Sequence, residues 1–338
     1  MTTIKEIAEK ANVSMSTVSK VLNNRTNSIS EETRNRIFEI AEQFQYKSNR
    51  KQTNKQLNKE IGILTWCSQQ DESNDPYFLS IRQGIEKQCN DLGIRLSKMI
   101  RMSDSMPNYK ENQLDGLIVI GKIDLDDLKK TFDREDRIVF VNQSPASLTF
   151  DSVVADFETA TQQVLDHFLR LGHTRIGYIG GEEYLQKYEE KRGEKAAEIR
   201  KETFENILKN KGYYNPKDVY IGEWTTASGY ELMKQALRDS EFLRAFFVAS
   251  DNLAIGAIRA LHESGFKVPD DVAIVSCDDI EIAAYVNPPL STVRVHTEQM
   301  GKSAVNVLNE RMNGRDIPVK VVIPTELIIR ESCGSKLT

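Results

Sequence analysis

The chain has 338 residues, enough for a small domain and a larger one, and 39% of them are hydrophobic. No window approaches the roughly 18 consecutive apolar residues of a membrane helix, and the first residues lack an apolar signal core, so we expect a cytoplasmic protein without membrane contact. The formal net charge of −5 argues against a nucleic-acid-binding protein unless positive charge is localised. Residues 1–60 carry 11 Lys and Arg against 7 Asp and Glu, so a basic excess lies at the amino end.

The stretch 3–23, TIKEIAEKANVSMSTVSKVLN, predicts a helix-turn-helix. Thr3 and Glu6 have the spacing of a capping box, which places a helix start beside them. Asn12 interrupts the apolar periodicity, and Ser14 can cap a second helix. Because the outward positions of this second helix are short, polar, flexible or cationic, it suits the major groove of DNA. The alternative is a small three-helix core with a solvated face.

A third helix is predicted to begin at Ser30, because Glu31 and Glu32 would stand in its first turn, where carboxylates favour the helix dipole. Residues 47–59 follow with five Lys and Arg residues, one leucine and no acidic residue. Such a stretch cannot bury enough apolar surface to fold alone. We therefore expect a helix-turn-helix headpiece at 1–46, a hinge linker at 47–60 and a larger body at 61–338.

In the body, short apolar strands alternate with amphipathic helices, which predicts an α/β fold with parallel sheets. Strands are expected to begin near Ile61, Ile94, Gly116, Ile138, Arg175, Val219, Ala245 and Val272. Helices are expected at 77–92, 158–171, 198–211, 228–237, 252–264 and 298–313. Eight strands exceed one ordinary doubly wound sheet, so we expect two lobes with a cleft at the carboxyl ends of their strands. Residues 101–113 are too few and too polar for the usual crossover helix.

The helix-turn-helix stretch resembles the headpiece of the lactose and galactose repressor family almost residue for residue. In the body, the runs LRLGHTRIGYIGG, FFVASDNLAIGAIRALHESGFKVPDDVAIVSCDD and PPLSTVRV are similar to landmarks of the sugar-binding domain of that family. The resemblance implies an all-α headpiece followed by an α/β, two-lobed domain like that of periplasmic sugar-binding proteins. It also implies that the PPL segment recrosses to the first lobe and that a last strand, VKVVIPTELIIR, closes the structure.

The resemblance assigns two kinds of DNA contact to the headpiece. Phosphate contacts position a protein on the duplex, whereas contacts with base edges read the sequence. We expect base contacts from Met15, Ser16 and Lys20, and phosphate contacts from Thr3, Ser14, Thr17 and Asn23.

The linker departs from the family pattern. In the family it becomes a hinge helix on DNA, and paired leucines enter the minor groove at the centre of the operator. Lys55 occupies the leucine position here, and Leu57 lies two residues later. Either Leu57 acts in a shifted register, or Arg50, Lys51 and Lys55 contact phosphates instead.

Polar and aromatic side chains that can bind a sugar stand at the predicted strand ends. Carboxylates accept hydrogen bonds from paired hydroxyls, and an aromatic ring covers the apolar face of a sugar. The candidates are Asp75, Tyr77, Asn142, Arg200, Trp224, Ser250 and Asp278, with Arg200 assigned as a paired hydroxyl donor by the resemblance. Alternatively, Trp224 belongs to the core and Arg200 to a solvated face. Asp279 is expected to cap a helix.

An enzyme is the rival class, because Asp75, Asp251 and Asp278 could include a glycosidase pair. The sequence has no phosphate-binding glycine loop, no G-x-S-x-G motif and no spaced His and Cys set, so we expect no catalysis, metal or cofactor. The four cysteines, Cys67, Cys89, Cys277 and Cys333, are far apart and are expected to be buried free thiols.

The sequence and the resemblance together predict a homodimeric repressor that binds a pseudo-palindromic operator in double-stranded DNA. The NDPY, GYEL and PPLSTVR stretches are most similar to members that respond to galactosides, which implies galactose or a β-galactoside as the effector. Two alternatives stay open: a ligand that strengthens operator binding, and a sugar sensor that no longer represses because its hinge is altered. Only eight residues follow VKVVIPTELIIR, without a leucine heptad, so no tetramer is expected.

Overall fold

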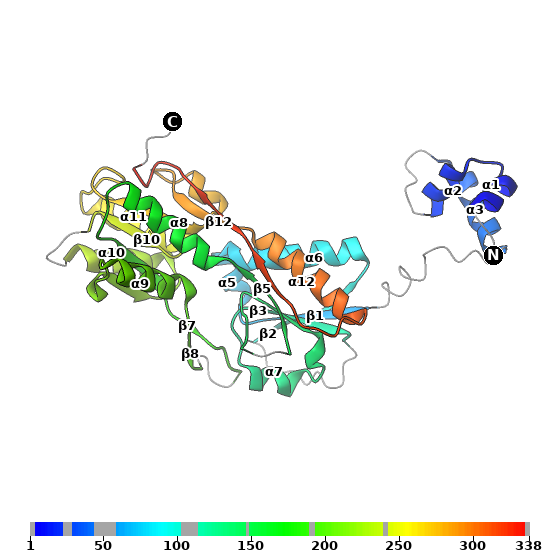
Figure 1. Ribbon diagram of the computed structural model, residues 1–338, viewed down its shortest axis with the longest axis horizontal. Coiled ribbons are helices and arrows are strands. Elements are labelled where there is room, and N and C mark those ends of the chain that lie inside the picture. Colours follow the sequence, from blue (N-terminus) through cyan, green and yellow to red (C-terminus); the bar gives the residue numbers. More distant parts are fainter. Residues whose placement is uncertain are drawn as a thin grey trace. The chain divides into compact units, whose positions relative to one another are not determined.

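The computed structural model describes residues 4–22, 29–43, 59–102, 114–146, 149–188, 193–238 and 243–334 (Figure 1). The chain divides into two compact units, Met1–Lys59 and Glu60–Thr338. Within the described ranges, every helix is too short or too polar to span a bilayer.

The described residues of the first unit form three helices, α1 (Ile4–Ala11), α2 (Met15–Leu22) and α3 (Glu31–Gln43). Their apolar faces enclose a small core of Ile7, Ala8, Ala11, Val18, Val21, Ile37 and Ala41. Asn12 has a φ of 51°, which turns the chain out of α1. The Ser14 hydroxyl then accepts a hydrogen bond from the Thr17 amide at 3.1 Å and caps α2. The predicted helix-turn-helix is confirmed, while Thr3, Asn23 and residues 44–58 lie outside the described residues.

The second unit is built on two six-stranded sheets, as the expectation of two lobes required. The first sheet has the order β13-β5-β4-β3-β1-β2 and is parallel throughout. It consists of β1 (Glu60–Thr65), β2 (Arg95–Arg101), β3 (Gly116–Ile120), β4 (Ile138–Val141), β5 (Asp151–Ala155) and β13 (Lys320–Ile323). Four of these strands were predicted, but β5 was missed.

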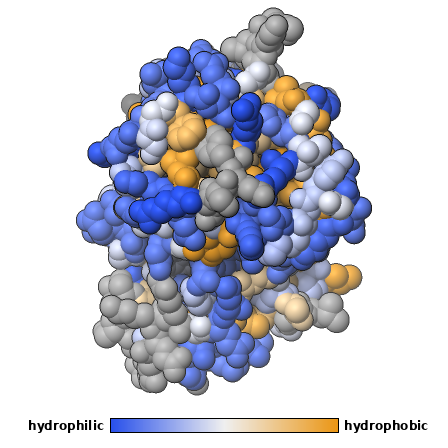
Figure 2. All heavy atoms as spheres, turned by 90° about the vertical axis from the view of Figure 1, so that its left-hand side faces the viewer, coloured by the Kyte–Doolittle hydropathy of each residue, from blue (hydrophilic) through white to orange (hydrophobic). Residues whose placement is uncertain are grey.

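The second sheet has the order β14-β12-β11-β10-β6-β9, and only β14 runs antiparallel to its neighbour. It consists of β6 (Gly177–Gly181), β9 (Val219–Gly222), β10 (Ala245–Val248), β11 (Ala273–Asp278), β12 (Ser291–Val295) and β14 (Thr325–Ile328). A short hairpin of β7 (Glu183–Tyr184) and β8 (Lys195–Ala196) extends from this lobe. Figure 2 views the end of this lobe, where hydrophilic side chains dominate and hydrophobic ones form separate small areas.

Helices cover both sheets. The first lobe carries α5 (Gln69–Asn74), α6 (Pro76–Leu92), α7 (Leu125–Thr131) and α12 (Thr297–Met312). The second carries α8 (Phe157–Arg170), α9 (Ile199–Lys211), α10 (Thr226–Arg238) and α11 (Asp251–Glu263). The six predicted helices of the body are confirmed to within two residues at each end, whereas the shorter α5 and α7 were not predicted.

The chain passes between the lobes three times, at Asp156, His296 and Pro324. The expected return to the first lobe at the PPL segment is therefore wrong by one strand, because β12 follows that segment and pairs with β11 in the second sheet. The single last strand was also wrong. Pro324 has no backbone N–H to donate, and the stretch divides there into β13 in the first sheet and β14 in the second.

Each lobe contains two helices whose backbones touch through glycines: α6 packs on α12, and α10 packs on α11. The glycines at these contacts are Gly84, Gly229, Gly256 and Gly301. A Cβ atom built on any of them would lie 1.9 to 2.1 Å from a backbone oxygen of the partner helix. Side chains at these positions would force the helices apart.

We predict that Gly301→Ala destabilises the second unit. In an open helix this change would stabilise by about 1 kcal/mol, because alanine is the better helix former. Here the added methyl group meets the Ile81 carbonyl oxygen, so the free energy of unfolding should fall by about 1 to 3 kcal/mol. Urea unfolding followed by tryptophan fluorescence measures it, since both tryptophans lie in this unit. Gln299→Ala is the control, because Gln299 is exposed on α12 and its amide donates to Ser303 of the same helix. Equal or greater stability of Gly301→Ala would contradict the close helix contact.

Candidate functional site

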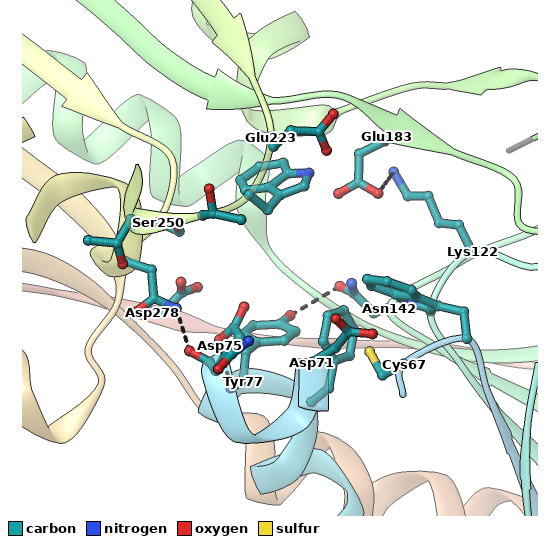
Figure 3. A pocket seen from close by; sticks show the side chains of 18 of the residues that line it. Cys67, Asp71, Asp75, Tyr77, Lys122, Asn142, Glu183, Glu223, Ser250 and Asp278 are labelled. Carbon is teal, nitrogen blue, oxygen red and sulfur yellow. Dashed lines mark hydrogen bonds and ion pairs between the residues drawn. The ribbon is translucent and has the colours of Figure 1, made fainter. Parts of the chain in front are cut away.

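A cavity of about 550 Å³ lies between the two lobes of the second unit. All seven residues expected to bind a sugar line it: Asp75, Tyr77, Asn142, Arg200, Trp224, Ser250 and Asp278. Figure 3 shows side chains from both lobes pointing into this space. The strand ends therefore meet as predicted, and what they bind stays a prediction.

The wall from the first lobe is ordered by hydrogen bonds among the predicted residues. Asp75 caps α6, and its Oδ1 accepts from the Tyr77 amide at 3.1 Å. The Tyr77 hydroxyl donates to Asn142 Oδ1 at 3.1 Å. Asn142 follows β4 in the left-handed region, with a φ of 66°, which directs its amide toward the cavity. Three polar side chains from the start of α6 and the end of β4 are thus held in one arrangement.

The wall from the second lobe places carboxylates at the ends of strands. Asp278 is the last residue of β11, with a φ of 120°, and it lines the cavity. Ser250 caps α11, where its hydroxyl accepts from the Leu253 amide at 3.3 Å. Burial raises the pKa of Asp278 well above its usual range, and the nearby Asp251 and Asp75 raise it further. Burial also raises the pKa of Asp75. This part of the cavity therefore disfavours additional negative charge.

Arg200 lines the cavity, and its expected role as a paired hydroxyl donor stays a prediction. Its side chain is buried, its Nε donates to Glu198 Oε1 at 2.6 Å, and its Nη1 donates to the Ala249 carbonyl at 2.8 Å. The guanidinium also stacks on the Trp224 ring, 4.8 Å from the ring centroid. Two of its donor groups are thus engaged within the protein. The guanidinium also lies over the Phe157 ring, 4.5 Å from its centroid, so it packs against two aromatic rings.

Trp224 is half-buried and lines the cavity, so it is not simply a core residue. Its indole Nε1 donates to the Glu182 carbonyl at 3.0 Å. Gly181 provides the space for the ring, because a Cβ at that position would lie 2.4 Å from the indole. The ring orientation is therefore fixed before any ligand arrives.

Several lining residues were missed from the sequence: Trp66, Asp71, Lys122, Glu183, Glu223 and Asn252. Four of them obey the rule that found the others. Trp66 follows β1 and Glu223 follows β9, while Lys122 comes soon after β3 and Glu183 soon after β6. Each therefore stands close to the carboxyl end of a parallel strand. Asp279 was assigned wrongly as a helix cap. It instead accepts from Arg294 Nε at 2.7 Å and Arg330 Nη2 at 2.6 Å.

Contacts between the lobes border the cavity on two sides. The Gln186 amide donates to the Lys122 carbonyl at 2.9 Å, and Lys122 Nζ lies 3.7 Å from Glu183 Oε2. At the other side, Asn252 Nδ2 donates to the Asn74 carbonyl at 3.4 Å. A ligand that changes the lobe spacing must alter these contacts.

In the headpiece, the predicted base-reading residues are accessible. Met15 is 55% exposed, and Ser16 and Lys20 are exposed on the same helix. Ser14 and Thr17, expected at phosphates, lie 2.8 Å apart between hydroxyl oxygens at the start of α2. Arg50 and Lys55, the predicted hinge contacts, lie outside the described residues.

Neither metal ligation nor thiol chemistry has a basis in the described part of the chain. No group of three His, Cys, Asp or Glu side chains there could hold a metal ion. The four cysteines are free and buried, as predicted, and burial raises the pKa of the Cys89 thiol to about 12. Buried neutral thiols are poor nucleophiles.

Both units of the chain match known protein families. Residues 3–49 match the bacterial regulatory proteins of the lacI family, and residues 165–333 match the periplasmic binding protein-like domain. The chain is 41% identical to the HTH-type transcriptional repressor MelR of Bacillus subtilis (strain 168), over 99% of this chain and 98% of the relative. It is 36% identical to the HTH-type transcriptional regulator GalR of Streptococcus thermophilus, over 98% and 99%. The structure of the lac repressor dimer bound to operator and the anti-inducer ONPF covers 98% of both chains with a TM-score of 0.69; at 24% identity, this likeness shows the fold.

We predict a pH effect from Asp251, which is fully buried beside the cavity. Its carboxylate accepts from Thr292 Oγ1 at 2.7 Å and from the Ile280 amide at 2.9 Å, yet burial raises its pKa to about 6. Because the pKa of this carboxyl is higher in the folded than in the unfolded state, its protonated form contributes to the stability of the folded protein at low pH. That contribution is lost as the pH rises through about 4 to 6. The free energy of unfolding should be measured at pH 5 and at pH 7.5. The decrease between these two pH values should be about 1 kcal/mol smaller in Asp251→Asn than in the unchanged protein. An unchanged difference would show that the carboxyl titrates normally.

Proposed function

The chain belongs to the lacI family of bacterial regulatory proteins, and we propose that it is a transcriptional repressor whose operator affinity is controlled by a sugar bound between the two lobes. The supporting observation is the cavity itself, in which carboxylates, an amide and a tryptophan from both lobes converge. Such a set fits a ligand that presents many hydroxyl groups and an apolar ring face. Its relatives are regulators, and we propose no catalytic activity.

Two headpieces in a homodimer would read the two halves of a pseudo-palindromic operator. The proposal is supported by the exposed face of α2 and by the dimeric state of the lac repressor structure with the same fold. Lys20 would donate to a base edge, and Ser14 and Thr17 would hold phosphates. For residues 47–58 the proposal keeps the phosphate contacts of Arg50 and Lys55, since lysine occupies the position of the usual leucine.

The effector is proposed to be galactose or a galactoside. The resemblance to galactoside-responsive members and the name GalR of a relative support this choice. A sugar that contacts Asp75 and Asn142 in one lobe and Trp224 and Asp278 in the other favours one lobe spacing over others. Control then requires only that the sugar and the operator prefer different spacings, with a coupling of about 1 to 3 kcal/mol.

We predict that the galactoside weakens operator binding. In fluorescence anisotropy at fixed salt, a saturating effector should lower operator affinity by about 5- to 150-fold. Asp278→Ala should keep operator affinity and lose the response, because sugar affinity falls by about 10- to 100-fold when charged hydrogen bonds are removed. Asp91→Ala, exposed on α6, is the control. Stronger operator binding with sugar would establish the co-repressor alternative, and no operator binding at low salt would leave only the sensor.

We also predict that Lys20 contributes to operator recognition. Lys20→Ala should weaken operator binding by about 5- to 100-fold, because a base contact is worth about 1 to 3 kcal/mol, while affinity for unrelated duplex falls less. Lys217→Ala removes the same charge from an exposed site of the second unit and should have no effect. A uniform loss on every DNA sequence would identify Lys20 as a phosphate contact instead.

A further inference from the structure

We infer that the effector is an uncharged sugar of at least two rings, and that its second ring lies on an aromatic platform formed by Trp66 and Phe78 in the first lobe. This inference rests on the proposed function, since it concerns the same cavity. Four features support it: the size of the cavity, a second tryptophan that is not fully paired, two separate groups of polar side chains, and the balance of charge.

The cavity is too large for one pyranose ring. A hexose has 12 non-hydrogen atoms, and even at the volume of a liquid water molecule for each, about 30 Å³, it would fill no more than about 360 Å³. The cavity measures about 550 Å³. Because about 360 Å³ is an upper bound for one ring, at least about 190 Å³ (550 minus 360) remains for an extension of the ligand.

Trp66 provides a second ring-binding surface. It follows β1, lines the cavity and packs edge-to-face on Phe78, with ring centroids 5.5 Å apart. Gly121, with a φ of 90°, makes room for it, because a Cβ there would lie 2.3 Å from the indole. The indole ring is therefore held in place on the wall opposite the second lobe.

The two tryptophans differ in their hydrogen bonding. The N–H of Trp224 is satisfied by the Glu182 carbonyl. Among the described residues, no acceptor lies within hydrogen-bonding distance of the Trp66 N–H, although this half-buried side chain lines the cavity. Indole N–H groups in such positions usually find a partner. A ligand hydroxyl oxygen would supply it, while the ring would cover a sugar face.

Polar groups gather at two ends of the cavity. Figure 3 shows Asp278, Ser250 and Asp75 on one side, and Asn142, Lys122 and Glu183 on the other. Each group contains donors or acceptors suited to sugar hydroxyls. One ring at the Asp278 end and another at the Lys122 end would use both.

The charges of the cavity exclude an anionic sugar. Five carboxylates line it, from Asp71, Asp75, Glu183, Glu223 and Asp278, against the cations Lys122 and Arg200. Arg200 is already paired with Glu198 at 2.6 Å, and Lys122 lies 3.7 Å from Glu183. Burial already raises the pKa of Asp75, Glu183 and Asp278, so a phosphate or carboxylate on the sugar would be buried where negative charge is disfavoured and both cations are engaged. Neutral hydroxyls can instead donate to the carboxylates.

Calorimetry on the full chain tests the inference with galactose, galactose 6-phosphate, and the β- and α-linked galactosyl disaccharides lactose and melibiose. We expect at least one disaccharide to bind about tenfold or more tightly than galactose, and no binding of the phosphate. Trp66→Ala should remove most of this advantage, because it weakens the disaccharide far more than galactose. Trp224→Ala should weaken both. Trp66→Phe keeps a ring and should lose less than Trp66→Ala, and thermal unfolding confirms that each variant is folded.

These measurements distinguish failure of the inference from failure of the proposed function. Galactose binding as tightly as both disaccharides, or Trp66→Ala weakening galactose and disaccharide equally in a folded protein, would overturn the second ring site and leave the proposed function intact. Tight binding of the phosphate would overturn the assignment of a neutral ligand. Binding of no sugar at all would overturn the proposed function and the inference together.

Discussion

The structure of the second unit depends on one constraint: the two walls of the cavity belong to different sheets, and the chain joins those sheets at three places, Asp156, His296 and Pro324. Three connections between the lobes limit how far they can move apart. The hairpin contact between Gln186 and Lys122 adds a non-covalent connection beside the cavity. Any ligand that contacts both walls therefore acts on the lobe spacing, which is a condition for control at a distance.

Several carboxyl groups are buried in or beside the cavity. Asp75, Asp251 and Asp278 lie close enough to raise the pKa of Asp278 together with burial. Such an arrangement costs stability in the empty protein, and hydrogen bonds from Thr292, Ile280 and Tyr77 offset part of that cost. Hydroxyl groups of a sugar would add donors where the carboxylates have few. The same feature explains why the cavity suits a neutral polyol better than an anion.

Much of this arrangement could be predicted from the sequence, because parallel strands place the residues that follow them at one edge of a sheet. That rule located Asn142, Trp224, Ser250 and Asp278 and would also have located Trp66, whereas Arg200 came from the family resemblance. It could not predict the hydrogen bond from Arg200 to the Ala249 carbonyl, since Ala249 follows β10 and is 49 residues away along the chain. The strand β5 was missed because its first residue, Asp151, is polar. Asp151 is nevertheless fully buried, and ion pairs with Arg311 and Arg315 at 2.7 and 2.8 Å permit it.

The central claim is that the sugar site and the operator site are coupled through the lobe spacing, and linkage gives the most direct test. The affinity of the full chain for its sugar should be measured by calorimetry with and without a saturating operator duplex. Coupling requires that operator DNA weakens sugar binding by the same factor by which the sugar weakens operator binding, about 5- to 150-fold. Identical sugar affinity in the presence and absence of operator would contradict the account.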